Sequence, residues 1–346
     1  MAEQRAMDRA LGALAGVAIG DAMGMPTQTL SRAQIGLSYG VITDLTDAVS
    51  GQPVSAGLMA GTVTDDMEQS LLLARHLLDR DGAFDEEAWA CTLLDWERDT
   101  HARGVNDLLG PSTKRALEAL QRGVPASATG RFGTTNGAAM RIVPVGISHA
   151  PEPLATFVDA VEATCRLTHN TTEAIGAASA VAAVVSAGLE GARFEDALAL
   201  ALAAAREGEQ RGVASTLGSI AGRIAWAVDL AAGKYGLDAA VMLADQIGTS
   251  VASHESVPMA FAVVRLAAQD PWQSAVISAN IGGDTDTIGA ISCGMAGACA
   301  GFSAIPISKW RLVAAVNGLE LENIAAGLLE IRRSRSARQR PLERAS

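Results

Sequence analysis

Two short segments of the chain each combine a pair of aspartates with threonine, and both are followed by a strongly apolar stretch. They are Thr62–Glu68, with the sequence TVTDDME, and Gly282–Gly289, with the sequence GGDTDTIG. The apolar stretches have helical periodicity, so both acidic segments are predicted to lie at the start of a helix. Carboxylates at these positions either cap the helix or perform chemistry beyond it.

Helix capping is the simpler interpretation of both segments. Asp65 is followed three residues later by Glu68, which matches a capping box, and Thr285 or Asp286 is a suitable cap for the second helix. Capping accounts for one carboxylate in each segment. It gives no role to the second carboxylate, or to the neighbouring glycines and threonine hydroxyls.

A metal centre is the alternative interpretation, if the two segments face each other. The oxygen ligands would then be Thr64, Asp65, Asp66, Asp284, Asp286 and Thr287. Four carboxylates held close together repel one another unless they are protonated or neutralised, and two divalent cations would balance their charge. Oxygen ligands without histidine or cysteine favour Mg²⁺ or Mn²⁺ over Zn²⁺. The spacing alone leaves capping and metal binding both open.

Three further polar segments precede an apolar run or a predicted helix. Gly133–Arg141 contains Thr135, Asn136 and Gly137 among small residues, which suits a loop whose backbone contacts a ligand, although Asn-Gly is also an ordinary turn. His169, in Leu167–Asn170, is interpreted first as a hydrogen-bonding or capping residue. His254–Pro258 is interpreted as a helix start. Because P-loop and dinucleotide-binding motifs are missing from the sequence, those enzyme classes are excluded.

The composition indicates the kind of fold that positions these residues. The chain has 346 residues, of which 49% are hydrophobic but only 4% aromatic, and it contains 35 glycines. This favours closely packed helices over a β-sandwich. Gly12, Gly16, Gly20 and Gly24 recur every four residues, so they lie along one face of a predicted N-terminal helix that another backbone can approach closely.

Helical periodicity predicts most of the remaining elements. The predicted helices are 67–79, 173–189, 195–206, 214–232, 237–247, 255–268 and 311–333, and Ser38–Leu45 is a weak strand candidate. Thr287–Ser308 is free of charge and long enough to span a membrane, but it is rich in glycine and follows a polar segment. It is therefore predicted to form a buried core helix followed by a turn.

Charge and cysteine content indicate which partners and which cellular compartment the protein is expected to have. A net charge of −11 disfavours binding to nucleic acids. Four scattered cysteines, in the absence of a signal sequence, are typical of buried, reduced thiols in a soluble cytoplasmic protein. The basic segment 334–346 is predicted to be a flexible C-terminal tail.

Taken together, five motifs between residues 11 and 291 resemble the ADP-ribosylglycohydrolase family, which includes the enzyme that removes ADP-ribose from dinitrogenase reductase. They are GALAGVAIGDAMGMP, TVTDDMEQSL, TTNGAAMRIVPVG, LTHN and NIGGDTDTIGAI. The resemblance implies an all-α, single-domain orthogonal bundle over residues 1–333 with two Mg²⁺ or Mn²⁺ ions in a central cleft. It implies the same six metal ligands, with Asp65 and Asp66 as catalytic residues. The substrate contacts that it implies are Gln28, Thr135, Asn136, Gly137, His169 and Gly283.

One position departs from the family pattern. Many members have a glutamate near the metals where this chain has Gln28, and an amide cannot act as a base. The segments GDAMGMP, LGPSTKRAL and ESVP resemble a bacterial subgroup whose substrate is a nucleoside-like riboside. From the family resemblance we expect a metal-dependent, ADP-ribosylglycohydrolase-like hydrolase of an N- or O-glycosidic bond at C1 of a ribosyl group. The alternatives are a hydrolase of free nucleosides or ribosylated metabolites, and a ligand-binding relative without activity.

Overall fold

The computed structural model describes residues 2–102 and 110–339. Helices make up 69% of the structure, and the described residues contain no β-strand. The first half contains α1 (Ala2–Gly24), η1 (Met25–Thr27), α2 (Arg32–Ser38), α3 (Asp65–Leu78), α4 (Glu86–Ala102), α5 (Pro111–Gln121), α6 (Ala126–Thr129), α7 (Gly137–Met140), α8 (Val143–Ser148) and α9 (Leu154–Cys165). The second half contains α10 (Thr172–Leu189), α11 (Phe194–Gly208), α12 (Ile220–Ala231), α13 (Gly236–Ile247), α14 (Ser253–Leu266), α15 (Pro271–Asn280), α16 (Thr285–Ala300), η2 (Phe302–Ala304), α17 (Ile307–Asn317) and α18 (Glu322–Gln339). The predicted all-α class is confirmed.

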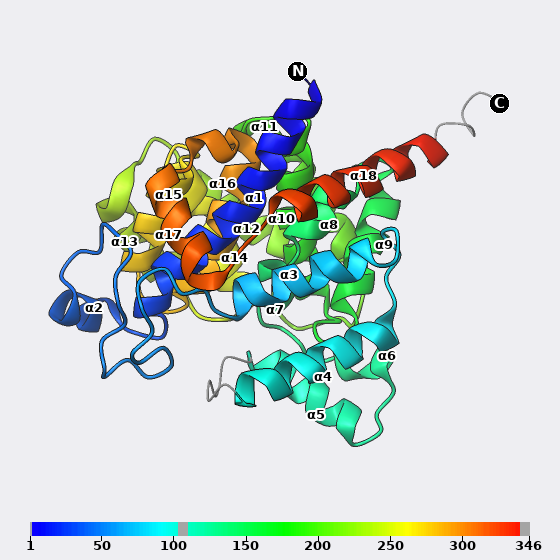
Figure 1. The fold of residues 1–346 in the computed structure, drawn as a ribbon, viewed down its shortest axis with the longest axis horizontal. Coiled ribbons are helices and arrows are strands. Elements are labelled where there is room, and N and C mark those ends of the chain that lie inside the picture. Colours follow the sequence, from blue (N-terminus) through cyan, green and yellow to red (C-terminus); the bar gives the residue numbers. More distant parts are fainter. Residues whose placement is uncertain (1, 103–109, 340–346) are drawn as a thin grey trace.

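Helices α1 and α16 pack against each other along their length in the middle of the molecule (Figure 1). The glycine face of α1 makes this approach possible. A Cβ atom added to Gly20 would lie 2.0 Å from the carbonyl oxygen of Gly289, and one added to Gly12 would lie 2.4 Å from that of Gly297. Side chains at these positions would push the helices apart. The predicted close approach at the glycine face is therefore confirmed, and α16 is its partner.

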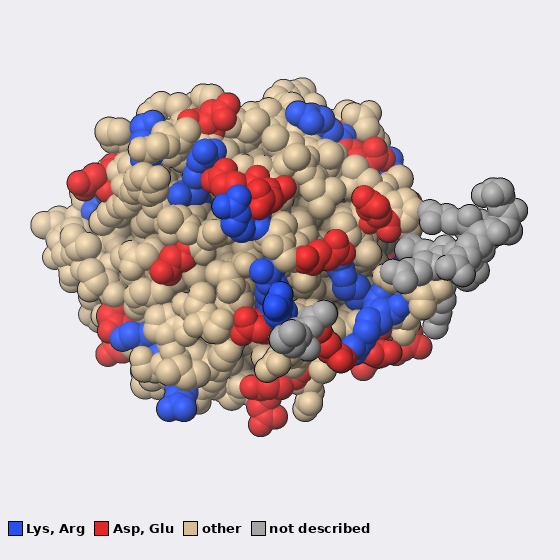
Figure 2. Space-filling model, turned by 90° about the horizontal axis from the view of Figure 1, so that it is seen from above, with Lys and Arg blue, Asp and Glu red and all other residues tan. Residues whose placement is uncertain are grey.

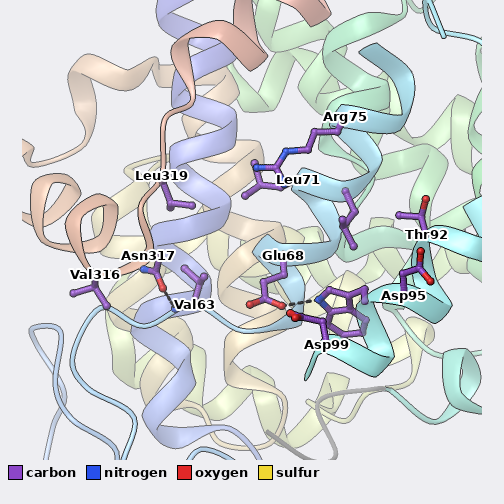
Figure 3. A pocket seen from close by; sticks show the side chains of 12 residues that line it. Val63, Glu68, Leu71, Arg75, Thr92, Asp95, Asp99, Val316, Asn317 and Leu319 are labelled. Atoms are coloured by element: carbon purple, nitrogen blue, oxygen red, sulfur yellow. Dashed lines mark hydrogen bonds between the residues drawn. The ribbon is translucent and has the colours of Figure 1, made fainter. Parts of the chain in front are cut away.

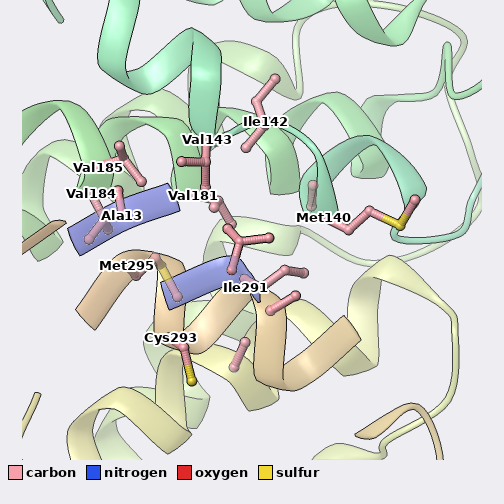
Figure 4. Close-up of a cluster of buried hydrophobic side chains, with 14 of the residues drawn as sticks. Ala13, Met140, Ile142, Val143, Val181, Val184, Val185, Ile291, Cys293 and Met295 are labelled. Carbon is pink, nitrogen blue, oxygen red and sulfur yellow. The ribbon is translucent and has the colours of Figure 1, made fainter. Parts of the chain in front are cut away.

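The apolar core forms where α1, α10 and α16 meet α7 and α8 (Figure 4). Small and β-branched residues fill it, including Ala13, Val181, Val184 and Ile291, each at most 1% exposed. Residues 285–299 of α16 are all buried, so the predicted buried helix after Thr287 is confirmed. The core thus holds the N-terminus of α16, and with it the second acidic segment, at a fixed place.

Several predicted elements are wrong in detail. The predicted helix 311–333 is two helices that meet at 97°, because Gly318 ends α17 in the left-handed conformation with φ 62°. The residues after Ser38 form no strand among those described, since Asn280 pairs with the backbone N–H and carbonyl of Ile42 in place of a neighbouring strand. The helix predicted from residue 214 begins at Ile220. Helices α2, α4, α5, α6, α7, α8, α9 and α15 were not predicted.

The surface charges, two apolar helices, the chain end and the cysteines add four observations. Figure 2 shows acidic and basic side chains interspersed over one face of the molecule. Helices α1 and α10 have the length and apolar composition of membrane spans, yet 94% and 89% of these stretches are buried inside the protein. Helix α18 runs to Gln339, past the predicted start of the tail at residue 334, and residues 340–346 lie outside the described residues. All four cysteines are free, but Cys91 is exposed, so that predicted burial is wrong.

Candidate active site

The two acidic segments lie next to each other although more than 200 residues separate them. Asp65 and Asp66 begin α3, and Asp284 and Asp286 lie at the start of α16. The hydroxyl of Thr287 donates a hydrogen bond to Oδ2 of Asp66 over 3.3 Å. The structure therefore brings together the two segments that the sequence singled out, through the packing of α3 and α16 against α1.

The capping interpretation of these aspartates is wrong for both helices. Thr64 and Asp284 occupy the N-cap positions of α3 and α16, and among the described residues neither side chain makes a capping hydrogen bond to its own helix. The predicted capping box does not form either, since Glu68 accepts from the indole Nε1 of Trp96 over 2.6 Å. The paired aspartates are left for another role.

Asp21, a residue that the sequence analysis did not assign to the site, caps α3 from another helix. Its carboxylate accepts from the backbone nitrogen of Thr64 at 2.9 and 3.0 Å and from that of Met67 at 3.1 Å. The hydroxyl of Thr64 also donates to it over 2.8 Å. The signal in the sequence that could have identified it is its charge, since Asp21 is the one charged residue between Arg9 and Arg32.

Burial raises the pKa of every carboxylate in this cluster. It raises the pKa of Asp21 to about 7 and that of Asp284 to about 6. The pKa values of Asp65, Asp66 and Asp286 are raised well above the usual range, first by burial and then by the negative charge of the other aspartates. The site therefore carries unfavourable charge that a cation or protons would relieve.

Two oxygens of the cluster have no hydrogen-bond partner in the described part of the chain. They are Oδ1 of Asp66 and Oδ1 of Asp286, and both are buried. A buried carboxylate oxygen without a partner is costly unless something else satisfies it. A hard divalent cation would satisfy both oxygens. Within residues 2–102 and 110–339, however, no three acidic, histidine or cysteine side chains have already converged into a metal-binding group.

A cavity of about 150 Å³ opens beside these aspartates, and we call it the acidic cavity. Eight of the twelve predicted site residues line it: Gln28, Asp65, Thr135, Asn136, Gly137, Asp284, Asp286 and Thr287. The other four, Thr64, Asp66, His169 and Gly283, lie outside its lining. The aspartates and the predicted substrate contacts thus surround one space.

Two loops hold one side of the acidic cavity together. The backbone nitrogen of Thr29 donates to the carbonyl of Gly283 over 2.7 Å, and that of Gly283 donates to Leu30 over 2.9 Å. Gly283 has φ +79°, and a Cβ atom there would lie 2.3 Å from the carbonyl oxygen of Thr249, so glycine is required. In the structure Gly283 holds its own loop against the loop of Thr29 and Leu30. The amide of Gln28 donates to the hydroxyl of Ser55 at the same edge.

Asn136, which lines the acidic cavity, forms hydrogen bonds to the second acidic segment and to α14. Its amide nitrogen donates to Oδ2 of Asp284 over 2.5 Å and to the hydroxyl of Ser256 over 2.9 Å. Ser256 belongs to a segment that the sequence indicated only as a helix start. Because the amide holds one oxygen of Asp284, that carboxylate keeps a defined orientation.

A second cavity of about 750 Å³ lies between α3, α4 and the turn from α17 to α18 (Figure 3). Glu68, three residues after Asp65 on α3, points into it with Arg75 and Asp99. Asn317 also lines it and accepts from the backbone nitrogen of Val63 over 3.1 Å. The lining of this cavity includes none of Asp65, Asp66, Asp284 and Asp286. Its greater size therefore does not make it the catalytic site.

Comparisons with family models, curated proteins and solved structures point to one family. The model of the ADP-ribosylglycohydrolase family matches residues 2–338. The Escherichia coli (strain K12) protein named "Uncharacterized protein YegU" is 34% identical over 95% of this chain and 99% of its own. The ADP-ribosylarginine hydrolase Tri1 of Pseudomonas putida (strain GB-1) is 32% identical over 59% of this chain and 53% of its own. A solved structure titled "ADP-ribosylglycohydrolase-related protein complex" superposes with a TM-score of 0.68 at 26% identity, covering 95% of this chain and 99% of that chain.

Proposed function

Because the chain belongs to the ADP-ribosylglycohydrolase family, we propose that it hydrolyses a glycosidic bond at C1 of a ribosyl group in the acidic cavity. The observation that carries the proposal is the pair of unpartnered oxygens, Oδ1 of Asp66 and Oδ1 of Asp286. These oxygens lie among carboxylates whose pKa values burial and mutual repulsion raise. Such a cluster lowers the stability of the folded protein, and clusters of this kind are typical of functional sites.

The donor set fits two hard divalent cations, Mg²⁺ or Mn²⁺. The residues that would hold them are Thr64, Asp65, Asp66, Asp284, Asp286 and Thr287. These cations would supply charge that neutralises the aspartates and Lewis acidity at the ribose. The single hydroxyl proton of Thr64 is directed at Asp21 over 2.8 Å, and Oδ2 of Asp66 lies 3.3 Å from the same hydroxyl oxygen, so Thr64 would contribute an oxygen lone pair from a fixed position.

The aspartates also have a direct role in the proposed reaction. Asp65 lines the cavity, where its carboxylate would position a water molecule or accept its proton as that water attacks C1. Asp66 lies behind the lining and would share this role. Cleavage of a glycosidic bond passes through a transition state with positive charge on the sugar ring, which the neighbouring carboxylates stabilise. The bond between C1 and the leaving group breaks and its electron pair goes to the leaving group. The water oxygen becomes the C1 hydroxyl, and the proton that this water loses passes by way of Asp65 or solvent water to the leaving group.

The size of the acidic cavity favours a small ribosyl substrate. About 150 Å³ is well below the roughly 300–1,000 Å³ typical of pockets for drug-sized ligands. A ribose ring fits such a space better than a complete ADP-ribosyl group does. We therefore propose a nucleoside-like riboside as the preferred substrate, and an ADP-ribosylated arginine or serine as the second candidate.

The test is a substrate panel assayed with Mg²⁺, with Mn²⁺ and with EDTA. The panel contains ADP-ribosylated arginine and serine peptides, an ADP-ribose ester and free nucleosides, and mass spectrometry detects the released ribose or ADP-ribose. We expect cation-dependent release from a riboside, and a loss of at least about 100-fold in Asp65→Asn and Asp66→Asn, the usual scale for removing acid–base catalysis.

Three results would contradict the proposal in different ways. Turnover that EDTA leaves unchanged would remove the cations from the mechanism. Full activity in both aspartate variants would place the chemistry elsewhere. Binding of a riboside without turnover, under every cation condition, would identify the chain as a ligand-binding relative without activity.

A further inference from the structure

A chain of hydrogen bonds runs from a buried arginine to the wall of the acidic cavity. Nη2 of Arg141 donates to the hydroxyl oxygen of Thr168 over 2.7 Å. That oxygen lies 2.7 Å from Nδ1 of His169, and Nε2 of His169 lies 3.0 Å from the hydroxyl oxygen of Thr135. Thr135 lines the cavity, whereas the other three residues are at most 1% exposed. His169 therefore reaches the cavity only through Thr135.

The guanidinium of Arg141 determines the direction of every bond in this chain, because it can donate but never accept. Its N–H occupies one lone pair of the Thr168 oxygen. Among the described residues, the acceptor within reach of the Thr168 hydroxyl proton is Nδ1 of His169. If Nδ1 itself carried a proton, the Thr168 hydroxyl would be buried without an acceptor, which is costly. The favoured tautomer of His169 therefore carries its proton on Nε2.

The consequence appears at Thr135. With the proton on Nε2, His169 donates to the hydroxyl oxygen of Thr135. This occupies a lone pair of that oxygen and leaves the Thr135 hydroxyl proton free to point into the acidic cavity. Burial and the nearby Arg141 charge both lower the pKa of His169, so the imidazole stays neutral and keeps this arrangement.

Two glycines allow the histidine to come this close. A Cβ atom added to Gly137 would lie 2.8 Å from Cε1 and 3.0 Å from Nε2 of His169. One added to Gly133 would lie 2.0 Å from the carbonyl oxygen of Thr168. The loop that carries Thr135 thus packs directly on the segment that carries His169, and any side chain at Gly133 or Gly137 would push the two apart.

We propose that His169 is a positioning residue that, held by Arg141 and Thr168, makes the Thr135 hydroxyl a dedicated hydrogen-bond donor to an acceptor oxygen of the ribosyl substrate. The substrate part of this inference rests on the proposed function, whereas the orientation of the imidazole does not. A donor at this position selects for a substrate that presents an oxygen acceptor there.

The first experiment measures the tautomer directly in the substrate-free wild-type protein. Two-bond ¹H–¹⁵N correlation spectra of the imidazoles report which nitrogen of each of the five histidines carries the proton, and His169→Gln identifies the His169 signals. If that variant does not fold, they are identified from the couplings of His169 to its own assigned backbone. We expect a neutral imidazole with the proton on Nε2 at pH 7 and above. A proton on Nδ1, or a doubly protonated ring at pH 7, would overturn the inference whatever the activity is.

The second experiment separates positioning from structure, using a riboside that the wild-type protein hydrolyses. Thr135→Val should raise KM about tenfold, the effect of one lost hydrogen bond, while Thr135→Ser should stay close to wild type. His169→Leu should raise KM by a similar factor alone but less than about twofold in the Thr135→Val background, because the two residues act in series. His169→Gln, which keeps an amide donor near the position of Nε2, should recover most of the loss.

The two proposals fail in distinguishable ways. A wild-type protein that turns over no substrate contradicts the proposed function but leaves the tautomer result standing. Additive effects of Thr135→Val and His169→Leu on KM, in an active protein, contradict the positioning role alone.

Discussion

The carboxylate of Asp21 on α1 accepts hydrogen bonds from both the backbone nitrogen and the hydroxyl of Thr64, the residue that precedes α3. One buried side chain thereby connects the glycine-faced helix, the start of α3 and the first acidic segment. The orientation of Asp65 and Asp66 depends on this connection, because α3 begins where Asp21 holds it.

Removing the Asp21 carboxylate should destabilise the protein. In Asp21→Ala, the backbone nitrogens of Thr64 and Met67 lose their acceptor inside the protein, which costs about 2–4 kcal/mol in the free energy of unfolding. Asp21→Asn keeps one acceptor oxygen and should lose less. Urea denaturation measures both, and an Ala variant as stable as the Asn variant would show that the capping bonds contribute little.

The contact between α1 and α16 should tolerate no side chain at Gly20. A methyl group there would lie 2.0 Å from the Gly289 carbonyl oxygen, so Gly20→Ala should cost about 3 kcal/mol. The matched control is Gly36→Ala, on an exposed face of α2 with nothing within 4 Å, which should gain about 0.5–1 kcal/mol from helix propensity. Equal melting temperatures of the two variants would contradict the close approach.

Asp286→Asn should have opposite effects with and without cations. In EDTA the substitution removes one charge from a repelling cluster and should raise the melting temperature. With Mg²⁺ or Mn²⁺ at 100 times Kd, the wild-type protein should gain about 2.7 kcal/mol and the variant much less. Asp229→Asn, at an exposed position on α12, is the control. Identical cation responses of wild type and Asp286→Asn would contradict the metal site.

Gln28→Glu should shift activity towards ADP-ribosylated substrates. Gln28 lines the acidic cavity and donates to the hydroxyl of Ser55. Its amide is neutral, whereas the family pattern has a carboxylate at this position. We expect weak wild-type turnover of ADP-ribosylated arginine or serine, better turnover of a smaller riboside, and a gain on the former in Gln28→Glu. Gln246→Glu, an exposed change of equal charge, controls for net charge. Strong wild-type hydrolysis of ADP-ribosylated protein, unchanged in Gln28→Glu, would show that this position does not govern the chemistry.

His149 should make the protein less stable in acid. Burial lowers its pKa to about 3, whereas an unfolded histidine has a pKa of about 6.5. Below pH 6.5 the unfolded state therefore binds a proton that the folded state does not, and stability falls by about 1.4 kcal/mol per pH unit until about pH 3. His149→Leu should reduce this slope between pH 6.5 and pH 5, whereas the exposed His101→Gln should not. Equal slopes in wild type and His149→Leu would contradict the shift.

Local patterns in the sequence were sufficient for the helical class and for most of the residues around the cavity. The repeat of Gly12, Gly16, Gly20 and Gly24 specifies a close helix contact, because four-residue spacing places them on one face whatever the partner is. The paired aspartates mark the starts of α3 and α16, because each pair directly precedes a stretch with helical periodicity. Spacing along one segment is a local property, and the sequence displays it directly.

Only the tertiary structure decided which of these residues meet. Asp21 caps α3 from 43 residues away, and the amide of Asn136 reaches Asp284 from 148 residues away. No spacing rule contains such contacts, since they result from the packing of helices that are distant in sequence. The same applies to His169, which the sequence placed at the substrate and the structure buries behind Thr135. The residue types determined what chemistry is available, and the packing of α1, α3 and α16 determined where it takes place.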